Sequence, residues 1–247
     1  ADMDALEIKE ENEISYKSQY KGKMHACGHD AHMACLLGAA KIFAKNKEIL
    51  QGKIKLIFQP GEEGGGGAKH IIDEGYFEDV DRVFGLHVWS PLKAGMIATT
   101  KKAMMASSDM FSITIKGKGG HAALPHLSND PTIVINELYD AFQKLITREI
   151  NPMHTSLITT PEFKGSDAGN VVPSIAVLKG TLRTFDMDDR EYILRRMKEI
   201  TENYSNAWNC TFKFELIGVS YPPLINTPST VDEVTDILKE LDEIQEI

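Results

Sequence analysis

The sequence has little of what disulfide-stabilised, membrane-spanning and nucleic-acid-binding proteins require. Its three cysteines, Cys27, Cys35 and Cys210, are too few and too scattered for a disulfide framework. No apolar run approaches the roughly 20 residues of a transmembrane helix, and no signal leader is recognisable in the first residues. The formal net charge of -9 leaves no excess of Lys and Arg for nucleic acid or an acidic membrane surface. We therefore expect a cytoplasmic protein that binds neither nucleic acid nor membrane.

What the chain does have is enough apolar material, 42% of 247 residues, to bury a substantial core. That length permits one large domain or two smaller ones. Residues 1–6 read like the end of a buried strand that runs into a loop, without a start methionine. We expect the sequence to be an excerpt from a longer polypeptide.

Apolar spacing in the first part of the chain alternates between the helical and the strand period. Residues 33–50 repeat apolar positions every three or four residues, which predicts a helix packed on a sheet. Residues 54–58 and 82–88 are short apolar runs that predict buried strands. Residues 68–75 predict a second helix, with Gly75 as its stop. This order predicts an α/β sheet domain.

A different rhythm begins near residue 108. Asp130 and Pro131 predict the cap and first position of a helix that runs to about residue 148, and Asp188 predicts the cap of another that runs to about residue 207. The order is β-α-β-β-α-β, which is typical of ferredoxin-like domains. The predicted strands are residues 110–116, 156–164, 175–185 and 211–219.

A helical pattern returns after residue 220. The chain therefore divides into residues 1–107, 108–219 and 220–247. We expect the middle part to be a small domain inserted into a larger α/β domain.

The densest group of chemically active side chains lies in residues 25–32, His-Ala-Cys-Gly-His-Asp-Ala-His. Thiolate, imidazole and carboxylate groups bind zinc and its neighbours in the transition series. Cys27 and His29, on either side of a glycine, can both point inward from a tight loop. The alternative is a polar loop that caps the following helix, although a cap needs far fewer potential ligands.

Two further segments gain meaning beside this group. Glu62 and Glu63 follow the predicted strand 54–58, and the carboxyl end of a strand is where ligands bind in open α/β sheets. Adjacent carboxylates suit a division between cation binding and proton transfer, but they also occur in solvated turns. The glycines after Glu63 lack the Gly-Lys-Ser/Thr ending of a phosphate-binding loop. His87 follows the apolar residues 83–86 near the end of the predicted strand 82–88, and a single His at a strand end is more often a packed core residue than a ligand.

The set Asp-x-Asp, Cys-Gly-His-Asp, Glu-Glu and Gly-Leu-His, in this order, resembles the M20 metallopeptidases. Within them it is most similar to the amidohydrolase branch, which includes aminoacylase-like, hippurate-hydrolysing and auxin-conjugate-hydrolysing enzymes. The resemblance runs over nearly the whole chain. It implies that residues 1–107 and 220–247 are parts of a zinc-peptidase-like catalytic sheet domain, and that residues 108–219 form an inserted ferredoxin-like lid and dimerisation domain.

The resemblance also implies a site. Glu62 would be the general base, Asp4 a carboxylate that orients a ligand, and His25, Asp30 and His32 supporting residues, whereas the role of Asp2 stays open. The site would hold one or two divalent ions per subunit, zinc first, with manganese, cobalt or nickel as alternatives. The implied metal ligands are Cys27, His29, Glu63 and His87.

In the expected lid, Gly-Gly-His-Ala-Ala at residues 119–123 resembles the family motif whose His reaches a neighbouring subunit's active site and binds the substrate carbonyl or oxyanion. That His is His121, which without the resemblance would be a polar loop residue. Asn170 resembles the residue that contacts the substrate carboxylate. Arg183 could assist by charge, although a strand Arg paired to an acid is commoner. Open sheet edges favour a homodimer through the lid.

The implied reaction is hydrolysis of the amide bond of an N-acyl amino acid or a short peptide with a free carboxylate. A bound metal would lower the pKa of water to about 7, and Glu62 would move the proton to the leaving amine. A cysteine hydrolase based on Cys27 and His29 is weaker, because a Cys-x-His loop directs both groups at one cation.

Two departures from the family pattern stand out. A further ligand His normally comes from beyond this chain's last residue, and no His follows His154. Glu7 also stands where the family commonly has Pro, which concerns only the local loop shape. Because of the first departure, the alternative is a catalytically incomplete metal-binding or dimerisation fragment.

Overall fold

The computed structural model describes residues 1–247, which form two compact units, residues 1–94 and residues 95–247. The chain is a mixed α/β protein. None of its helices combines the length and the apolar character needed to cross a bilayer.

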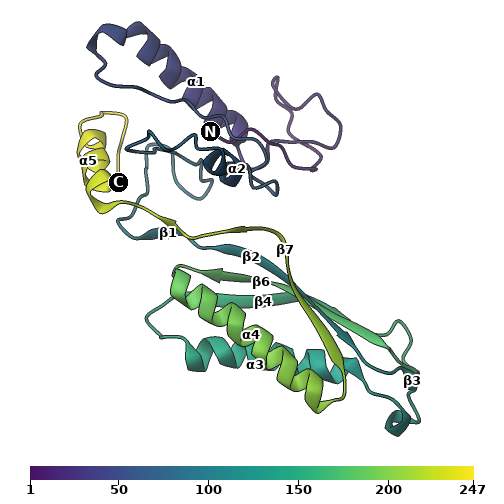
Figure 1. Ribbon diagram of the computed structural model, residues 1–247. Helices are drawn as coiled ribbons and strands as arrows, with labels where there is room; N and C mark the ends of the chain where they lie inside the picture. Colours follow the sequence, from purple (N-terminus) through teal and green to yellow (C-terminus); the bar gives the residue numbers. More distant parts are fainter. The chain divides into compact units, whose positions relative to one another are not determined.

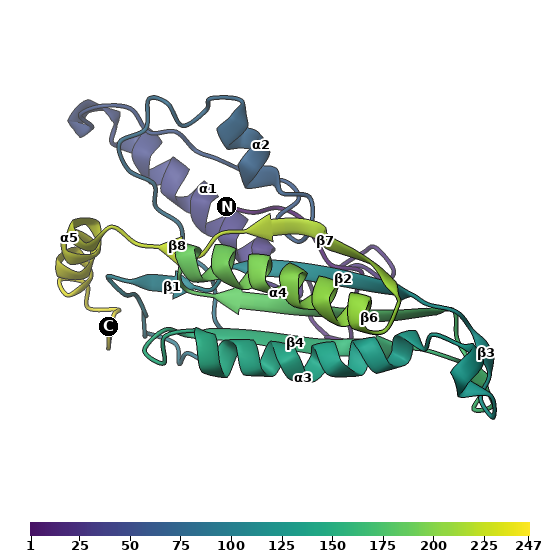
Figure 2. The same ribbon diagram turned by 60° about the horizontal axis from the view of Figure 1, so that its bottom comes forward.

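The larger unit is built on a four-stranded antiparallel sheet with the strand order β4-β6-β2-β7. Two long helices, α3 (Pro131–Glu149) and α4 (Met187–Ala207), lie on one face of this sheet (Figure 1; Figure 2). The strands are β2 (Ser108–Lys116), β4 (Ser156–Lys164), β6 (Ile175–Thr184) and β7 (Thr211–Tyr221).

The core of this unit lies between the sheet and its two helices. In β2, alternate residues Phe111, Ile113 and Ile115 are fully buried, as expected for a strand with one covered face. The ring of Phe111 meets the ring of Phe142 on α3 edge to face, with centroids 6.2 Å apart. The other fully buried apolar side chains on β6 and the helices include Ala176, Leu178, Leu182, Val134, Ile135, Leu138, Ile193 and Met197.

The two long helices begin at carboxylate caps. Asp130 accepts the N–H of Thr132 at 2.8 Å and Pro131 takes the first helical position, as predicted. The prediction of Asp188 as the second cap was wrong. Asp186 is the cap, and its Oδ1 accepts the N–H groups of Asp188 at 2.9 Å and Asp189 at 3.0 Å. Asp188 instead lies in the first turn, where its charge faces the positive end of the helix dipole.

Short elements flank the four-stranded sheet. Strand β1 (Ala103–Met105) pairs antiparallel with β8 (Leu224–Ile225), so the segments before and after the sheet lie side by side. Helix α5 (Pro228–Leu238) follows β8. Strand β3 (Gly120–His121) pairs with β5 (Val171–Val172).

The smaller unit contains helices α1 (His29–Lys45) and α2 (Gly67–Asp73). Helix α1 begins four residues before the predicted start, whereas Gly75 ends the α2 region with a φ of 80° as expected. The predicted strands at residues 54–58 and 82–88 are absent. The nearest sheet contact is one parallel bridge between Asp2 and Gln59.

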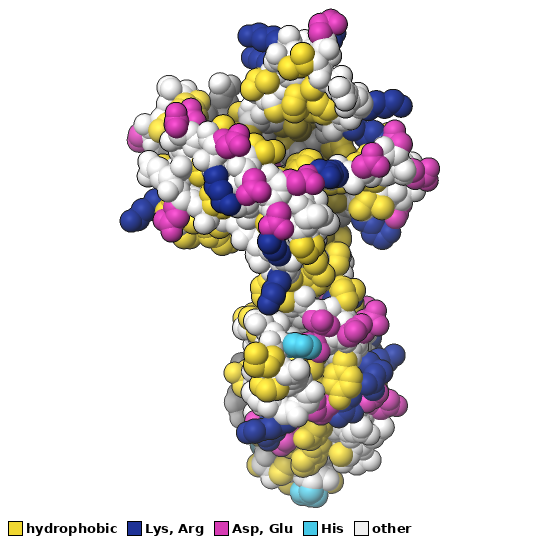
Figure 3. Space-filling model, turned by 90° about the vertical axis from the view of Figure 1, so that its left-hand side faces the viewer, with side chains coloured by type: hydrophobic (Ala, Val, Ile, Leu, Met, Phe, Trp, Pro, Cys, Tyr) yellow, Lys and Arg dark blue, Asp and Glu magenta, His cyan; other side chains and the backbone are white.

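Both strand predictions failed because a strand needs a hydrogen-bonded neighbour as well as an apolar sequence. Residues 1–94 supply no such neighbour for residues 82–88, and Val83, Phe84 and Leu86 are 65%, 64% and 61% exposed. Figure 3 shows hydrophobic side chains open to solvent among acidic and basic ones. The buried side chains of this unit, glycines aside, are His29 and His32.

The larger unit depends on a buried ion pair. The carboxylate of Asp109 is fully buried and accepts two hydrogen bonds from Arg190, from Nε at 2.7 Å and Nη2 at 2.6 Å. We predict that Asp109→Asn lowers the free energy of unfolding by about 3 kcal/mol, because it leaves a partly buried guanidinium without its counter-charge. The measurement is urea unfolding followed by circular dichroism.

Asp140→Asn is the matched control, since Asp140 forms an exposed ion pair with Lys144 on α3. It should change the free energy of unfolding by less than about 0.5 kcal/mol. Equal effects of the two substitutions would contradict the role given to the buried pair.

Candidate metal centre

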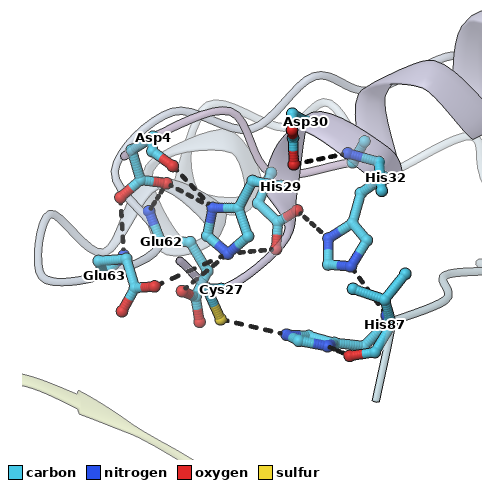
Figure 4. Close-up of polar contacts among 12 residues, drawn as sticks. Asp4, Cys27, His29, Asp30, His32, Glu62, Glu63 and His87 are labelled. Carbon is cyan, nitrogen blue, oxygen red and sulfur yellow. Dashed lines mark hydrogen bonds and ion pairs between the residues drawn. The ribbon is translucent and has the colours of Figure 1, made fainter. Parts of the chain in front are cut away.

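Four separate segments of residues 1–94 meet at one place (Figure 4). They are the N-terminal residues 2–4, the loop and first turn of α1 at residues 27–32, the Glu-Glu turn at residues 62–63, and residues 87–88. All four residues that the resemblance implies as metal ligands are in this group.

His29 is the centre of the group. It is the first residue of α1 and only 1% exposed. Its Nδ1 donates to the main-chain oxygen of Asp4 at 2.9 Å, which fixes the proton on that nitrogen. Its Nε2 is buried and has no hydrogen-bond partner. A buried polar atom without a partner is costly, and a cation is one group that satisfies a bare imidazole nitrogen.

Carboxylates surround this nitrogen. The Nε2 of His29 lies 3.3 Å from Oδ2 of Asp2, 3.8 Å from Oε1 of Glu63 and 3.9 Å from Oε2 of Glu62. Ligand atoms of His29, Glu62 and Glu63 lie within 4.8 Å of one another. This spacing suits a shared cation, because metal–ligand bonds of about 2 Å place two ligand atoms up to about 4 Å apart.

Cys27 and His87 complete a second group around His29. The sulfur of Cys27 lies 3.4 Å from Nε2 of His87, and ligand atoms of these two residues and His29 lie within 4.8 Å of one another. Nδ1 of His87 donates to the main-chain oxygen of Val88 at 2.6 Å, so its Nε2 faces the sulfur. Imidazole, thiolate and carboxylate form the donor set that zinc and its neighbours prefer, so the residues present fit a divalent transition metal.

The side chain of Asp4 binds the backbone of the turn that contains Glu62 and Glu63. Its two carboxylate oxygens accept the N–H groups of Glu62 at 3.0 Å and Glu63 at 2.9 Å. Burial alone would raise the pKa of Asp4. The hydrogen bonds have the larger effect, so the pKa of Asp4 lies below its ordinary value. Asp4 therefore stays ionised and orients both glutamates as well as His29.

The electrostatics of the group disfavour a free thiolate. Burial, together with the charges of Glu63 and Glu62, raises the pKa of Cys27 to about 11. Burial and the neighbouring Glu63 also raise the pKa of Glu62. Since the nucleophile of a cysteine hydrolase is a thiolate, a protonated Cys27 argues against that alternative. A bound cation reverses this balance and favours the thiolate.

The residues expected to assist the ligands differ in their contacts. The carboxylate of Asp30 accepts a hydrogen bond from the neighbouring N–H of Ala31, at 3.0 Å, and contacts none of the expected ligands. Nδ1 of His25 is buried without a hydrogen-bond partner. His32 contacts both Asp2 and Val88, a double contact that sequence spacing gave no sign of.

The expected substrate-binding residues lie in the larger unit. His121 on β3 and Asn170 before β5 line one open cleft of about 700 Å³, and the N–H of Ala122 donates to the main-chain oxygen of Asn170 at 3.0 Å. Arg183 lies on β6 and is not among the residues that line this cleft. Its Nη1 donates to the oxygen of Leu182 at 3.1 Å and to the hydroxyl of Thr181, not to an acid. Their roles stay predictions.

Gly28 allows Val88 to approach the first turn of α1. It has a φ of 88°, and a Cβ there would lie 2.4 Å from Cγ2 of Val88. We predict that Gly28→Ala displaces Val88 and His87 and weakens zinc binding at least about tenfold, measured by competition with a chromophoric chelator.

Gly22→Ala is the control for backbone strain. Gly22 has a φ of 76°, and a Cβ added there would have nothing within 4 Å, so the substitution carries only the left-handed penalty of about 1–2 kcal/mol. Equal zinc affinities for the two variants would show that the contact with Val88 is irrelevant to the site.

Known proteins resemble this chain in sequence and in fold. The sequence matches the model of peptidase family M20/M25/M40 over residues 1–247. Thermostable carboxypeptidase 1 of Saccharolobus solfataricus is 38% identical over 248 residues, which cover 100% of this chain and 63% of that protein. N-acetyl-L-cysteine deacetylase of Bacillus subtilis is 40% identical over 236 residues, covering 96% of this chain and 56% of that protein.

The fold is similar to that of a dinuclear metal-binding peptidase of the M20 family from Bacillus subtilis, with a TM-score of 0.81 and 28% identity over 100% of this chain and 63% of the other. The chain spans about 63% of the length of the carboxypeptidase and of this peptidase. Because the family model matches the whole chain, the chain belongs to peptidase family M20/M25/M40.

Proposed function

We propose that the protein is a metal-dependent hydrolase that cleaves the amide bond of N-acyl amino acids or short peptides with a free carboxylate. The observation that carries the proposal is the buried, unpartnered Nε2 of His29 among a thiol, an imidazole and carboxylates. The names of the relatives add support, since one is a carboxypeptidase and another deacetylates N-acetyl-L-cysteine.

The residues that would hold the metal are Cys27, His29, Glu63 and His87. The groups of potential ligands share His29. Its one free nitrogen can bind one ion, so of the proposed one or two ions per subunit a second would be held by the other side chains. Thiolate and imidazole donors favour zinc, with manganese, cobalt or nickel as alternatives. Bound there, a divalent ion would polarise the substrate carbonyl and acidify water.

Glu62 would carry the proton. Its carboxylate lies beside the ligand group, with Oε2 at 3.9 Å from Nε2 of His29, and Asp4 holds its backbone. It would accept a proton from the attacking water and return it to the nitrogen of the leaving amine, so that one carboxylate serves as base and then as acid.

The four-stranded sheet with α3 and α4 would be a ferredoxin-like lid, residues 108–219, inserted into a catalytic domain formed by residues 1–107 and 220–247. The pairing of β1 with β8 supports an insertion, because the chain enters and leaves the sheet at neighbouring points. Strands β4 and β7 are open edges, which suits a homodimer. In this proposal His121 binds the substrate carbonyl of the partner site, and Asn170, with Arg183, binds the carboxylate.

A second candidate is a catalytically incomplete metal-binding and dimerisation fragment. Assays of N-acyl amino acids with zinc, manganese or cobalt separate the candidates, since the fragment would bind metal without turnover.

A cytoplasmic location is also proposed, which fits three unpaired cysteines.

We predict that Glu62→Gln lowers kcat by about 100-fold or more and leaves the metal content unchanged, because the amide cannot take up the proton. Metal content is measured by atomic emission and turnover by release of the amino acid. Glu63→Gln is the matched control on the adjacent residue, and it should lose metal as well as activity. Wild-type turnover by Glu62→Gln would remove the general-base assignment.

We predict that Asn170→Ala raises KM about tenfold for substrates with a free carboxylate, because a hydrogen bond to a charged group is lost. KM for the corresponding carboxamides should change little, so the preference between the two substrate types shrinks. Asn206→Ala, an exposed position on α4, is the control and should leave both values unchanged. An unaltered preference in Asn170→Ala would exclude Asn170 from carboxylate binding.

A further inference from the structure

His32 is a buried histidine that uses both ring nitrogens within the protein. It lies on α1 one turn after His29 and is 3% exposed. Its Nε2 accepts the N–H of Val88 at 2.9 Å, and because a backbone N–H can only donate, this nitrogen carries no proton. The proton therefore lies on Nδ1, which donates to Oδ1 of Asp2 at 2.6 Å.

This arrangement removes His32 from the candidate ligands. Ligand atoms of Asp2, His29 and His32 lie within 4.8 Å of one another, so distance alone would allow a third ion-binding group. A metal ligand must present an unshared nitrogen lone pair, and His32 has none left while both hydrogen bonds persist. We therefore look for the function of His32 in the two groups that it binds, the carboxylate of Asp2 and the N–H of Val88.

Each of the two groups leads to the metal centre from a different segment. Asp2 belongs to the N-terminal segment, and its second oxygen, Oδ2, lies 3.3 Å from Nε2 of His29. Val88 follows His87, and its main chain is held at both ends, by His32 at the N–H and by the His87 ring at the oxygen. The rings of His32 and His87 meet edge to face, with centroids 4.6 Å apart.

We propose that His32 is a positioning residue that binds no ion and locks Asp2 and His87 in place around the metal centre. Figure 4 shows the His32 ring between His29 and the His87 segment. The inference rests on the proposed metal binding but concerns a residue outside the ligand set. Partners of ligands in this role typically contribute 10–100-fold to metal affinity, so His32→Ala should weaken binding of zinc and cobalt by about that factor.

Two variants separate the two contacts. The amide of Asn reaches the position of Nδ1, so His32→Asn keeps a donor to Asp2 and loses the bond to Val88. The amide of Gln reaches the position of Nε2, so His32→Gln keeps an acceptor for Val88 and loses the bond to Asp2. Each should weaken cobalt binding by about tenfold, less than His32→Ala does. His70→Asn and His70→Gln, at an exposed His of α2, are the matched controls and should bind cobalt as the wild type does.

The absorption spectrum of the cobalt-loaded full chain tests positioning directly. At saturating cobalt, His32→Gln should keep the wild-type thiolate-to-cobalt charge-transfer band of Cys27, because the His87 segment is still held. His32→Asn should shift or weaken that band. A residue that only contributes to folding would lower the melting temperature in both variants without separating their spectra.

The outcomes distinguish this inference from the proposed function. A wild-type chain that binds neither zinc nor cobalt overturns both. If the folded His32→Asn and His32→Gln variants bind cobalt as tightly as the wild type does, the positioning role is wrong and the proposed function stands. A folded His32 variant that binds fewer ions at saturation identifies His32 as a ligand and also overturns the inference.

Discussion

The constraint on which the smaller unit depends is the concentration of negative charge around one buried imidazole nitrogen. Asp2, Glu62 and Glu63 all place a carboxylate oxygen within 3.9 Å of Nε2 of His29. In a partly buried site such charges repel strongly unless a positive charge lies among them. A divalent cation bound to these side chains removes the repulsion and gives the nitrogen its missing partner. The arrangement is therefore explained by a cation site. A salt-bridge network would need positively charged side chains, and these carboxylates have only histidine beside them.

Polar contacts replace an apolar core in holding this site. The buried side chains of residues 1–94 are two histidines, while the apolar core lies in the larger unit. The contacts that hold the site join residues far apart in sequence, such as Asp4 with Glu63 and His32 with Val88. Each costs chain entropy to form, so the geometry of the site depends on all of them at once.

An element was predicted correctly from the sequence where its neighbouring strands and covering helices belong to this chain. The helices and strands of residues 108–221 were predictable because alternating strands such as Ser108–Lys116 find their neighbours and covering helices within this chain. The apolar runs at residues 54–58 and 82–88 were misread, because their composition is that of a strand but no strand pairs with them. Asp186 was missed because three nearby aspartates satisfy the same capping pattern. Ligand types were readable from Cys27 and His29, but the double contact of His32 depends on a tertiary approach that spacing does not encode.

Four internal contacts of the site follow one rule, which explains how the site can exist before an ion binds. His29 and His87 each use Nδ1 for a main-chain oxygen, which leaves Nε2 directed at the other ligands. Glu62 and Glu63 are held by Asp4 through their backbone N–H groups, so neither contact occupies a glutamate carboxylate. In these four contacts the atoms that fix the residues are different from the atoms that would bind the cation, whereas the contact of the Cys27 sulfur with Nε2 of His87 joins two prospective ligand atoms. A site built in this way exchanges few internal hydrogen bonds for metal bonds, so little of the binding free energy is lost to reorganisation.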